Sequence, residues 1–107
     1  MVRIPTHRPP THPGAIILHE FLEPLGMTQH AAAEQLGVSR VRLNQIIKAR
    51  RGVTPDTALR LARLFGLEPQ TWLNLQLAWD LYHAIHSDAS REINKIRRHP
   101  QLERAIA

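Results

Sequence analysis

Residues 27–52 read "MTQHAAAEQLGVSRVRLNQIIKARRG", and this stretch decides the fold. Thr28 can cap a first short helix, and Gly37 supplies the left-handed conformation that commonly ends one. Ser39 can then cap a second helix, which runs to about Lys48 and leads into the basic corner "KARRG". The stretch therefore predicts two short helices joined by a tight turn.

The positions that would hold such a pair in a fixed pose are small or apolar. Ala33 is small where the two helices cross, Gly37 opens the turn and Val38 plugs it. The side chains that point inward are Ala32, Leu36, Leu43 and Ile46. This is the pattern of a helix-turn-helix unit, which offers its second helix to the major groove of DNA.

The outer side of the second helix is rich in groups that read bases. The forked guanidinium of Arg pairs best with guanine, and the amides of Asn and Gln pair best with adenine. Arg40 and Val41 lie at the leading end of the helix, and Asn44 and Gln45 follow one turn later. We expect these four residues to contact base edges.

A second group of residues is suited to the phosphate backbone. Gln29 begins the first helix, where a side-chain amide and free backbone N–H groups can both approach a phosphate. The other predicted backbone contacts are Ser39, Arg42, Lys48, Arg50, Arg51 and Thr54. Residues 40–51 hold five basic groups and no acid, so binding should weaken steeply with salt.

The alternative for this charge is a solvated helical face, which is the commonest position of charge on any helix. Taken alone, the charge would favour that alternative. Combined with the helix-turn-helix framework it favours DNA, although some helix-turn-helix domains bind only protein.

Proline and apolar spacing organise the chain before this unit. Residues 1–13 carry four of the eight prolines and are predicted to form an arm without regular structure, because proline cannot continue a helix. A helix is predicted from Gly14, and Pro24 should end it near Glu23. The residues expected on its buried face are Leu18, Phe21, Leu22 and Leu25.

Two further helices are predicted after this unit. The segment "TPDTALRLARLFG", residues 54–66, has a capping Thr, a Pro at the first helical position and a terminal Gly. From Pro69 to about Ser87 the pattern is apolar on most sides. Its polar residues form one narrow strip, Gln76, Asp80 and His83. A helix of this kind must bury two faces, so one should pack on its own domain and the other on a partner.

The chain divides into three parts. These are a flexible Pro-rich arm (1–13), a helix-turn-helix domain that includes the helix with two apolar faces (14–89), and a basic C-terminal helical tail (90–107). The basic residues of the tail include Arg91, Lys95, Arg97 and Arg98, with weak apolar anchors at Ile93 and Ile96. No segment alternates as a strand does, so the expected fold class is all-α with five or six helices.

Composition narrows the function further. The 107 residues suit one domain, and a net charge of +5 with a pI near 11.1 favours an acidic partner, either nucleic acid or anionic lipid. The absence of Cys excludes thiol catalysis and cysteine-ligated zinc. No apolar run is long enough to cross a bilayer and no secretory signal is evident, so we expect a cytoplasmic protein that does not bind membranes.

Other chemistries have little support in the sequence. His83 and His86 stand three apart, but no third metal ligand is evident nearby, and histidines at the surface or at an interface are the better interpretation. Glu20 and Glu23 are neighbours on a helical face, where such pairs are usually solvated charge. With no nucleophile beside a base and no phosphate-binding glycine loop, the chain is expected not to be an enzyme and to need no cofactor or metal.

The segment "TQHAAAEQLGVSRVRLNQI" resembles the Cro and phage-repressor class of helix-turn-helix proteins, which have the lambda-repressor-like fold. Around it, "HPGAIILHEFLEPLGMTQ", "TPDTALRLARLFG" and "WLNLQLAWDL" follow one another in an order that resembles the HigA-type antitoxins, also called virulence-associated protein I. The resemblance covers roughly residues 12–82.

This resemblance implies a bacterial antitoxin that dimerises, binds a palindromic operator in its own promoter and neutralises a HigB toxin, a RelE-like ribonuclease that cuts mRNA on ribosomes. It maps the DNA-reading helix onto Ser39 to Lys48, and it associates the helix containing "WLNLQLAWDL" with the dimer contact, at Leu73, Leu77 and Leu81. The toxin surface is expected in the N-terminal arm or the first helix. The alternative is a stand-alone helix-turn-helix transcriptional regulator of the same fold.

Overall fold

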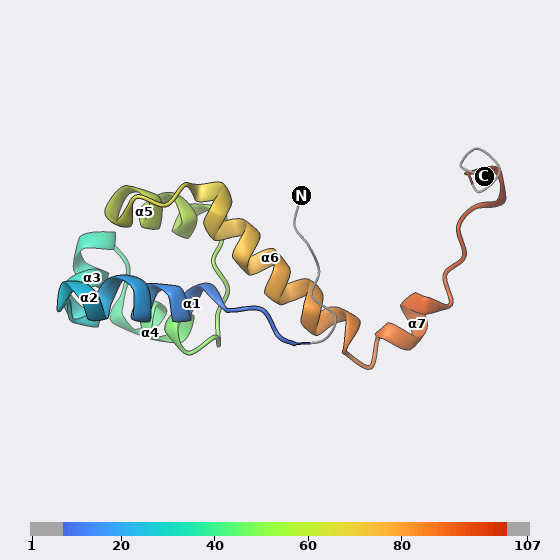
Figure 1. The fold of residues 1–107 in the computed structure, drawn as a ribbon, viewed down its shortest axis with the longest axis horizontal. Helices are drawn as coiled ribbons and strands as arrows, with labels where there is room; N and C mark the ends of the chain where they lie inside the picture. The colour runs from blue at the N-terminus through green and yellow to red at the C-terminus, as the bar shows by residue number, and fades with distance from the viewer. Residues whose placement is uncertain (1–7, 103–107) are drawn as a thin grey trace.

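The computed structural model describes residues 8–102, and all regular structure in this range is helical, as predicted (Figure 1). The elements are α1 (Pro13–Ile16), η1 (Ile17–Leu22), α2 (Glu23–Leu25), α3 (Gln29–Leu36), α4 (Arg40–Ile47), α5 (Pro55–Phe65), α6 (Pro69–Ile85) and α7 (Ser90–Asn94). Elements α1, η1 and α2 follow one another without a break and form the first helix. No helix in the described range is long and apolar enough to cross a membrane.

The prediction that Pro24 ends the first helix near Glu23 is wrong. The middle of this helix, η1, is π-helical, and the backbone N–H of Glu23 donates to the carbonyl oxygen of Leu18, five residues back. The wider π turn accommodates the proline ring, and Pro24 has no N–H that would need an acceptor. The helix therefore continues to Leu25 and ends at Gly26, which has a φ of 62°.

The same π turn changes which residues of the first helix are buried. Ile17 and Leu22 are fully buried, five positions apart, which places them on the same side of a π turn. Leu18 and Phe21 are half-buried, whereas Leu25 is 65% exposed. The predicted burial of Leu25 is therefore wrong, because the prediction assumed uniform α-helical spacing.

The predicted arm is shorter than residues 1–13. The first helix begins at Pro13, and the Nδ1 atom of His12 caps it by accepting a hydrogen bond from the backbone N–H of Gly14 at 2.9 Å. His12 and Pro13 are both buried. In the described residues the segment without regular structure therefore ends at His12, one residue before the predicted end of the arm, and the part of the predicted arm in residues 1–7 lies outside the described residues.

The predicted capping residues of the next three helices are confirmed. The hydroxyls of Thr28, Ser39 and Thr54 each accept a backbone N–H from the first turn of α3, α4 and α5 respectively. Gly37 and Gly66 end α3 and α5 with φ angles of 73° and 91°. Since these interactions lie within four residues of one another, the sequence alone is sufficient to define these helix ends.

The core lies between the first helix and α3 to α6. Its buried apolar residues are Ile17, Leu22, Ala32, Ala33, Leu36, Leu43, Ile46, Val53, Ala58, Leu61 and Trp72. Burying a large aliphatic or aromatic side chain contributes about 1.5–3 kcal/mol relative to leaving it exposed. Stacking of Phe21 on Phe65, with ring centroids 4.6 Å apart, also joins the first helix to α5. All the inward positions predicted for the helix-turn-helix unit belong to this core.

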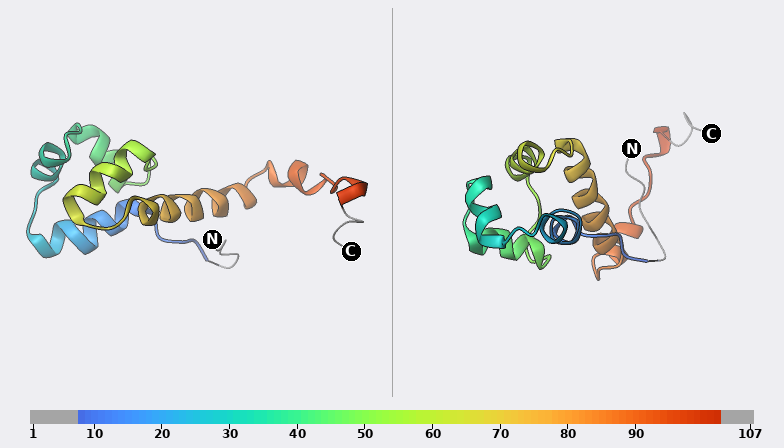
Figure 2. Two further views of the ribbon diagram at one scale, coloured as in Figure 1. Left: turned by 90° about the horizontal axis from the view of Figure 1, so that it is seen from above. Right: turned by 60° about the vertical axis from the view of Figure 1, so that its left-hand side comes forward.

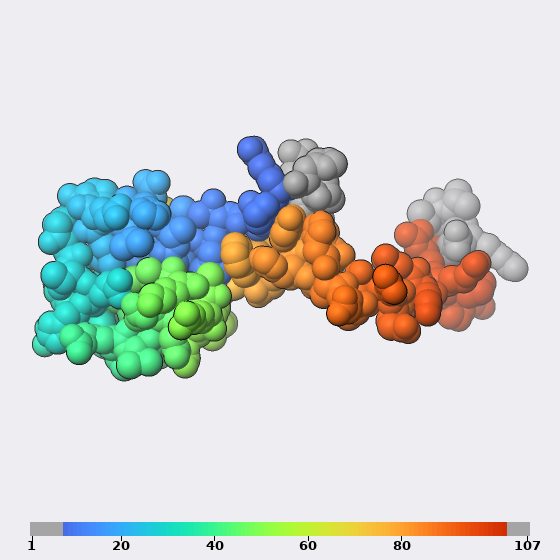
Figure 3. All heavy atoms as spheres, turned by 90° about the horizontal axis from the view of Figure 1, so that it is seen from below, coloured from blue at the N-terminus to red at the C-terminus, as the bar shows by residue number. Residues whose placement is uncertain are grey.

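Helix α6 packs on α5 and α1 and then projects away from the domain (Figure 2). In the space-filling view α6 and the segment after it form a narrow extension of the compact domain (Figure 3). The predicted polar strip on α6 is only partly correct, because Gln76 is 7% exposed whereas Asp80 and His83 are exposed. Helix α7 is short and exposed, and its predicted anchors Ile93 and Ile96 are 53% and 76% exposed.

Candidate nucleic-acid interface

The turn between α3 and α4 is held by the backbone and by one arginine from α5. The N–H of Val38 donates to the carbonyl oxygen of Ala33 at 3.0 Å. Arg60 donates through Nη1 to the carbonyl oxygen of Leu36 at 2.9 Å, which places a cation at the C-terminal end of α3. The relative pose of α3 and α4 is therefore fixed from the core side and from α5.

The four predicted base-reading residues share one depression on the outer side of α4. Val41 is 66% exposed at its rim, and Arg40 is also exposed. The residues that line the depression are Gln29, His30, Arg40, Val41, Asn44, Gln45 and Arg50. Donor and acceptor side chains thus surround one apolar group, a combination that suits the edges of bases and the methyl group of thymine.

His30 lines this depression although the sequence analysis did not assign it a role. It is the second residue of α3 and is exposed beside Gln29. A single His on a short helix forms no pattern that is specific for DNA binding. The only indication in the sequence was that His30 is next to Gln29, a predicted phosphate contact. In the structure it extends the candidate surface from α4 onto α3.

Hydrogen bonds hold three of the amide side chains that line the depression. Asn44 donates through Nδ2 to Oε1 of Gln29 at 3.1 Å, so a predicted base reader on α4 is tied to a predicted phosphate contact on α3. Arg51 donates through Nε to Oε1 of Gln45 at 2.9 Å. These bonds restrict the side-chain rotamers before any ligand binds, which lowers the entropy cost of binding.

The basic corner (residues 48–52) follows α4 directly. Lys48, Arg50 and Arg51 are exposed on it, as predicted for phosphate contacts. Ala49 has a φ of 59°, a left-handed conformation that a residue with a Cβ rarely adopts. The corner therefore turns sharply, and it places Arg50 at the edge of the same depression.

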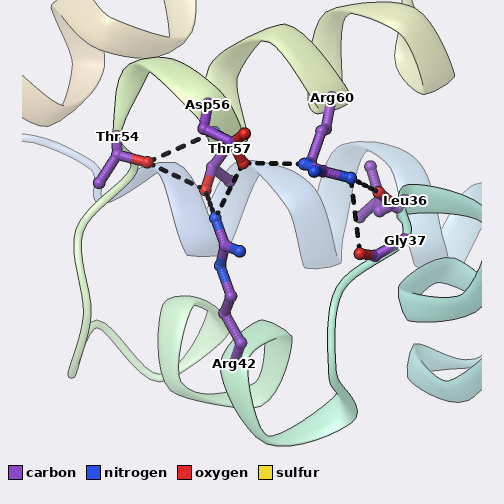
Figure 4. A network of polar contacts seen from close by, with 7 residues as sticks. All are labelled: Leu36, Gly37, Arg42, Thr54, Asp56, Thr57 and Arg60. Atoms are coloured by element: carbon purple, nitrogen blue, oxygen red, sulfur yellow. Dashed lines mark hydrogen bonds and ion pairs between the residues drawn. The ribbon is translucent and has the colours of Figure 1, made fainter.

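Arg42 is held within the domain instead of pointing outward. Its Nη2 atom donates to Oγ1 of Thr57 and lies 3.3 Å from Oδ1 of Asp56 (Figure 4). A hydrogen bond from Arg60 and a second one from Arg42 lower the pKa of Asp56 below its ordinary value. Arg42 is thus engaged with α5 and joins the reading helix to the beginning of α5.

Two further predicted backbone contacts are used as helix caps. The hydroxyl of Ser39 accepts the backbone N–H of Arg42 at 3.0 Å, and the hydroxyl of Thr54 accepts that of Thr57 at 3.4 Å. Both residues are exposed, so a cap and a phosphate can share the same oxygen only if the hydroxyl hydrogen points outward. Lys48, Arg50 and Arg51 are exposed cations, so they are better suited than these two hydroxyls to the predicted phosphate contacts.

The predicted dimer-contact residues lie on α6, outside the depression. Leu73 is half-buried and packs in part against the core of its own domain, Leu81 is half-buried, and Leu77 is 45% exposed. Ile85, at the end of the same helix, is 41% exposed. The structure therefore shows an uncovered apolar surface on the helix where two apolar faces were predicted.

The histidines near the end of α6 pack with aromatic rings. His83 lies against Trp79 with ring centroids 4.4 Å apart, and His86 lies against Tyr82 at 4.3 Å. Within residues 8–102 no three His, Cys, Asp or Glu side chains are grouped closely enough to hold a metal ion. Both histidines are exposed and each lies against an aromatic ring of its own helix.

The geometry of α3, α4 and their turn is that of a known family. The family model described as "Helix-turn-helix" matches residues 18–72. The chain belongs to this helix-turn-helix family. Virulence-associated protein I of Dichelobacter nodosus is 52% identical to it over 73 residues, which cover 68% of each chain. Antitoxin HigA-1 of Vibrio cholerae is 42% identical over 78 residues, which cover 72% of each chain.

A solved structure extends this similarity to three dimensions. It is described as Pseudomonas aeruginosa antitoxin HigA with the higBA promoter, and it superposes with a TM-score of 0.76 at 35% sequence identity. The match covers 82% of this chain and 96% of that one. The resemblance to HigA-type antitoxins is therefore confirmed. The two HigA relatives are described as antitoxins and not as enzymes, which supports the prediction that the chain is not an enzyme.

Proposed function

We propose that this chain is a HigA-type antitoxin that binds an operator in its own promoter and represses its own operon. The observation that carries the proposal is the depression on α4, where Arg40, Val41, Asn44 and Gln45 meet Gln29 and Arg50. A second support is the matching fold of the HigA antitoxin whose description names its promoter. In this assignment Arg40, Val41, Asn44 and Gln45 read bases, and the exposed basic residues of the corner contact phosphates.

The protein acts as a homodimer in this proposal. The uncovered apolar surface of α6, centred on Leu77 and flanked by Leu73 and Leu81, is the proposed contact between two copies. A two-fold axis at this contact would present two α4 helices to successive major grooves, about 34 Å apart. The operator is then palindromic, because its two half-sites face identical reading helices.

The second proposed partner is a HigB-like toxin, an mRNA-cleaving ribonuclease. The support is the similarity to antitoxin HigA-1 over 72% of the chain. The toxin contact is assigned to the N-terminal arm or the first helix, where Leu25 is 65% exposed beyond the core. Binding of the toxin modulates occupancy of the operator, so that repression depends on the ratio of the two proteins.

One preparation tests both parts of the proposal. The tagged protein is purified from its native host, its bound proteins are identified by mass spectrometry, and the same preparation is titrated with its own promoter and with a shuffled sequence. A copurified ribonuclease that this chain inhibits, together with preference for the promoter, supports the antitoxin function. Promoter preference without such a ribonuclease supports the alternative, a stand-alone transcriptional regulator. No preference for the promoter contradicts both.

A further inference from the structure

Gln76 of α6 is hydrogen-bonded to Val53, the residue that directly follows the basic corner. Gln76 accepts the backbone N–H of Val53 through Oε1 at 2.8 Å and donates through Nε2 to Oδ1 of Asp80 at 3.0 Å. Gln76 is 7% exposed and Val53 is 5% exposed, so water does not readily replace the bond between them. The side-chain amide of Gln76 therefore has both of its functions satisfied.

The backbone of the corner approaches this amide more closely than a side chain would allow. A Cβ atom added to Gly52 would lie 3.1 Å from both Cδ and Nε2 of Gln76. Such a separation is shorter than most real contacts of a Cβ atom, so a residue larger than glycine requires the amide to move by a few tenths of an ångström. Gly52 thus lies directly against the side chain of Gln76, and the corner ends against α6.

The opposite side of the corner is tied to the reading helix. The backbone N–H of Arg50 donates to the carbonyl oxygen of Gln45 at 2.8 Å, and Nε of Arg51 donates to Oε1 of the same residue at 2.9 Å. Ala49, directly before Arg50, has a φ of 59°, a conformation that costs about 1–2 kcal/mol without support. The corner is thus held between two helices, α4 and α6.

A recess beside this contact shows that α6 and the corner face each other. It is lined by residues from the corner and the loop after it, and from α6 by Gln76, Trp79 and Asp80. His12 closes one side, with its ring against Trp79 at a centroid distance of 4.9 Å. The first helix, the corner and α6 therefore meet around Gln76.

We infer that Gln76 is a positioning residue for DNA binding, which sets the pose of the basic corner so that Arg50 and Arg51 reach the phosphates. The inference rests on the proposed function. Because Gln76 is next to Leu77, one turn of α6 carries both the support for the corner and the centre of the proposed dimer contact. In the dimer, Leu77 then sets the spacing of the two reading helices, and the adjacent Gln76 sets the pose of each corner.

The variants are chosen to separate positioning from folding. Gln76→Met keeps the length of the side chain and removes both hydrogen bonds. Gln76→Glu combined with Asp80→Asn keeps an acceptor for Val53 and reverses the second hydrogen bond, and the net charge is unchanged. Gly52→Ala crowds the amide of Gln76, which must move by a few tenths of an ångström, and leaves every residue of α6 unchanged. Thermal unfolding and sedimentation establish which variants are folded and retain the wild-type oligomeric state.

The first readout is the salt dependence of binding to promoter DNA. For Gln76→Met and for Gly52→Ala the slope of log K against log salt should fall by about one to two units, one for each phosphate that Arg50 or Arg51 no longer neutralises. The double variant should restore the slope. A wild-type slope in both Gln76→Met and Gly52→Ala overturns the inference, and so does a double variant that stays as low as Gln76→Met.

The second readout needs no DNA and therefore separates this inference from the proposed function. Amide hydrogen exchange in residues 49–53 should be faster in Gln76→Met than in the wild type and slow again in the double variant. Unchanged exchange in this segment overturns the inference. Wild-type protein that shows no promoter preference contradicts the proposed function, whereas the exchange experiment still decides whether Gln76 holds the corner.

Discussion

Arg42, on the outer helix of the helix-turn-helix unit, donates its Nη2 to the hydroxyl of Thr57, two residues inside the next helix (Figure 4). Asp56 accepts from Arg42 at 3.3 Å and from Arg60 at 2.8 Å, and Arg60 reaches the carbonyl end of α3. A chain of polar contacts therefore joins α3, α4 and α5 at the surface, beside the apolar core that joins them inside.

Removing the hydroxyl of Thr57 tests this chain of contacts. Thr57 is 3% exposed, and Thr57→Val keeps its shape while deleting the acceptor for Arg42. The free energy of unfolding should fall by about 1 kcal/mol, the usual net value of one hydrogen bond, as measured by chemical denaturation. The matched control is Thr71→Val on an exposed part of α6, where we expect a change within about 0.5 kcal/mol. Equal decreases in the two variants would contradict the role of Thr57.

Gly14 tests the close packing of the first helix on α4. A Cβ atom at this position would lie 2.0 Å from the carbonyl oxygen of Ile46 and 2.7 Å from Cα of Ile47. Because both neighbours are backbone atoms, Gly14→Ala should destabilise the fold by about 3 kcal/mol or more. Gly66→Ala, which has open space around it but a φ of 91°, should cost only about 1–2 kcal/mol. Thermal unfolding that ranked the two variants in the opposite order would disprove this packing.

Arg50 tests whether the basic corner contacts phosphates. Arg50→Ala should weaken binding to all DNA sequences to a similar extent and lower the salt slope by about one unit. Arg63 is an exposed arginine of α5 that lines a different part of the surface, so Arg63→Ala is the matched control and should leave the slope unchanged. Fluorescence anisotropy over a range of salt concentrations measures both. A change of sequence preference in Arg50→Ala would instead place this residue among the base readers.

Leu77 tests the proposed dimer contact. Leu77→Asp should convert the dimer into a monomer in sedimentation velocity, because a carboxylate would be buried without a partner at the centre of the contact. Leu59 on α5 is 58% exposed, compared with 45% for Leu77, so Leu59→Asp introduces the same charge at a leucine that is somewhat more accessible. It should remain dimeric. A dimer that persists in Leu77→Asp, with the native fold retained, would assign the contact to another surface.

Because His12 is buried, we predict that the free energy of unfolding depends on pH. Burial lowers the pKa of His12, the nearby Asp80 carboxylate partly opposes this, and His83 lowers it further. Since the folded pKa is below the unfolded value of about 6.5, the unfolded chain binds more protons as the pH falls. The contribution of His12 to the free energy of unfolding is complete above the unfolded pKa of about 6.5, and it is lost as the pH falls through the folded pKa.

The variant His12→Asn tests this dependence. Asn can still cap the first helix but does not titrate, so its free energy of unfolding should decline less than that of the wild type as the pH is lowered from above the unfolded pKa of His, about 6.5, to below the folded one. His99→Asn, in the exposed C-terminal segment, is the control and should retain the wild-type dependence. Parallel curves for the wild type and His12→Asn would show that His12 does not contribute to the pH dependence.

Local interactions explain why so much of the fold was predictable. The caps at Thr28, Ser39 and Thr54 and the left-handed glycines at 37 and 66 depend on residues within one helical turn. The inward positions of the helix-turn-helix unit follow the period of an α-helix, and they are buried as expected. The π turn was not predictable from an assumed uniform period, and it is the reason that Leu25 was wrongly assigned to the core.

The features that the sequence did not reveal depend on contacts between distant residues. The partners of Gln76 include Val53, 23 residues away, and Arg42 meets Thr57, 15 residues away. From the sequence alone Gln76 was placed on a polar strip and Arg42 on a phosphate-binding surface. In the structure the amide is buried against the basic corner and the guanidinium is held by α5. Polar side chains with such distant partners have no local pattern that would reveal them.

The central claim is that the depression on α4 reads the operator. The most direct test is to measure the affinity of the wild type, Arg40→Ala and Gln45→Ala for promoter DNA and for each single-base substitution of the operator. The account predicts that each variant loses about 1–3 kcal/mol of discrimination at particular base pairs and keeps it at the others. If both variants kept the wild-type preference at every position, α4 would not be the reading helix.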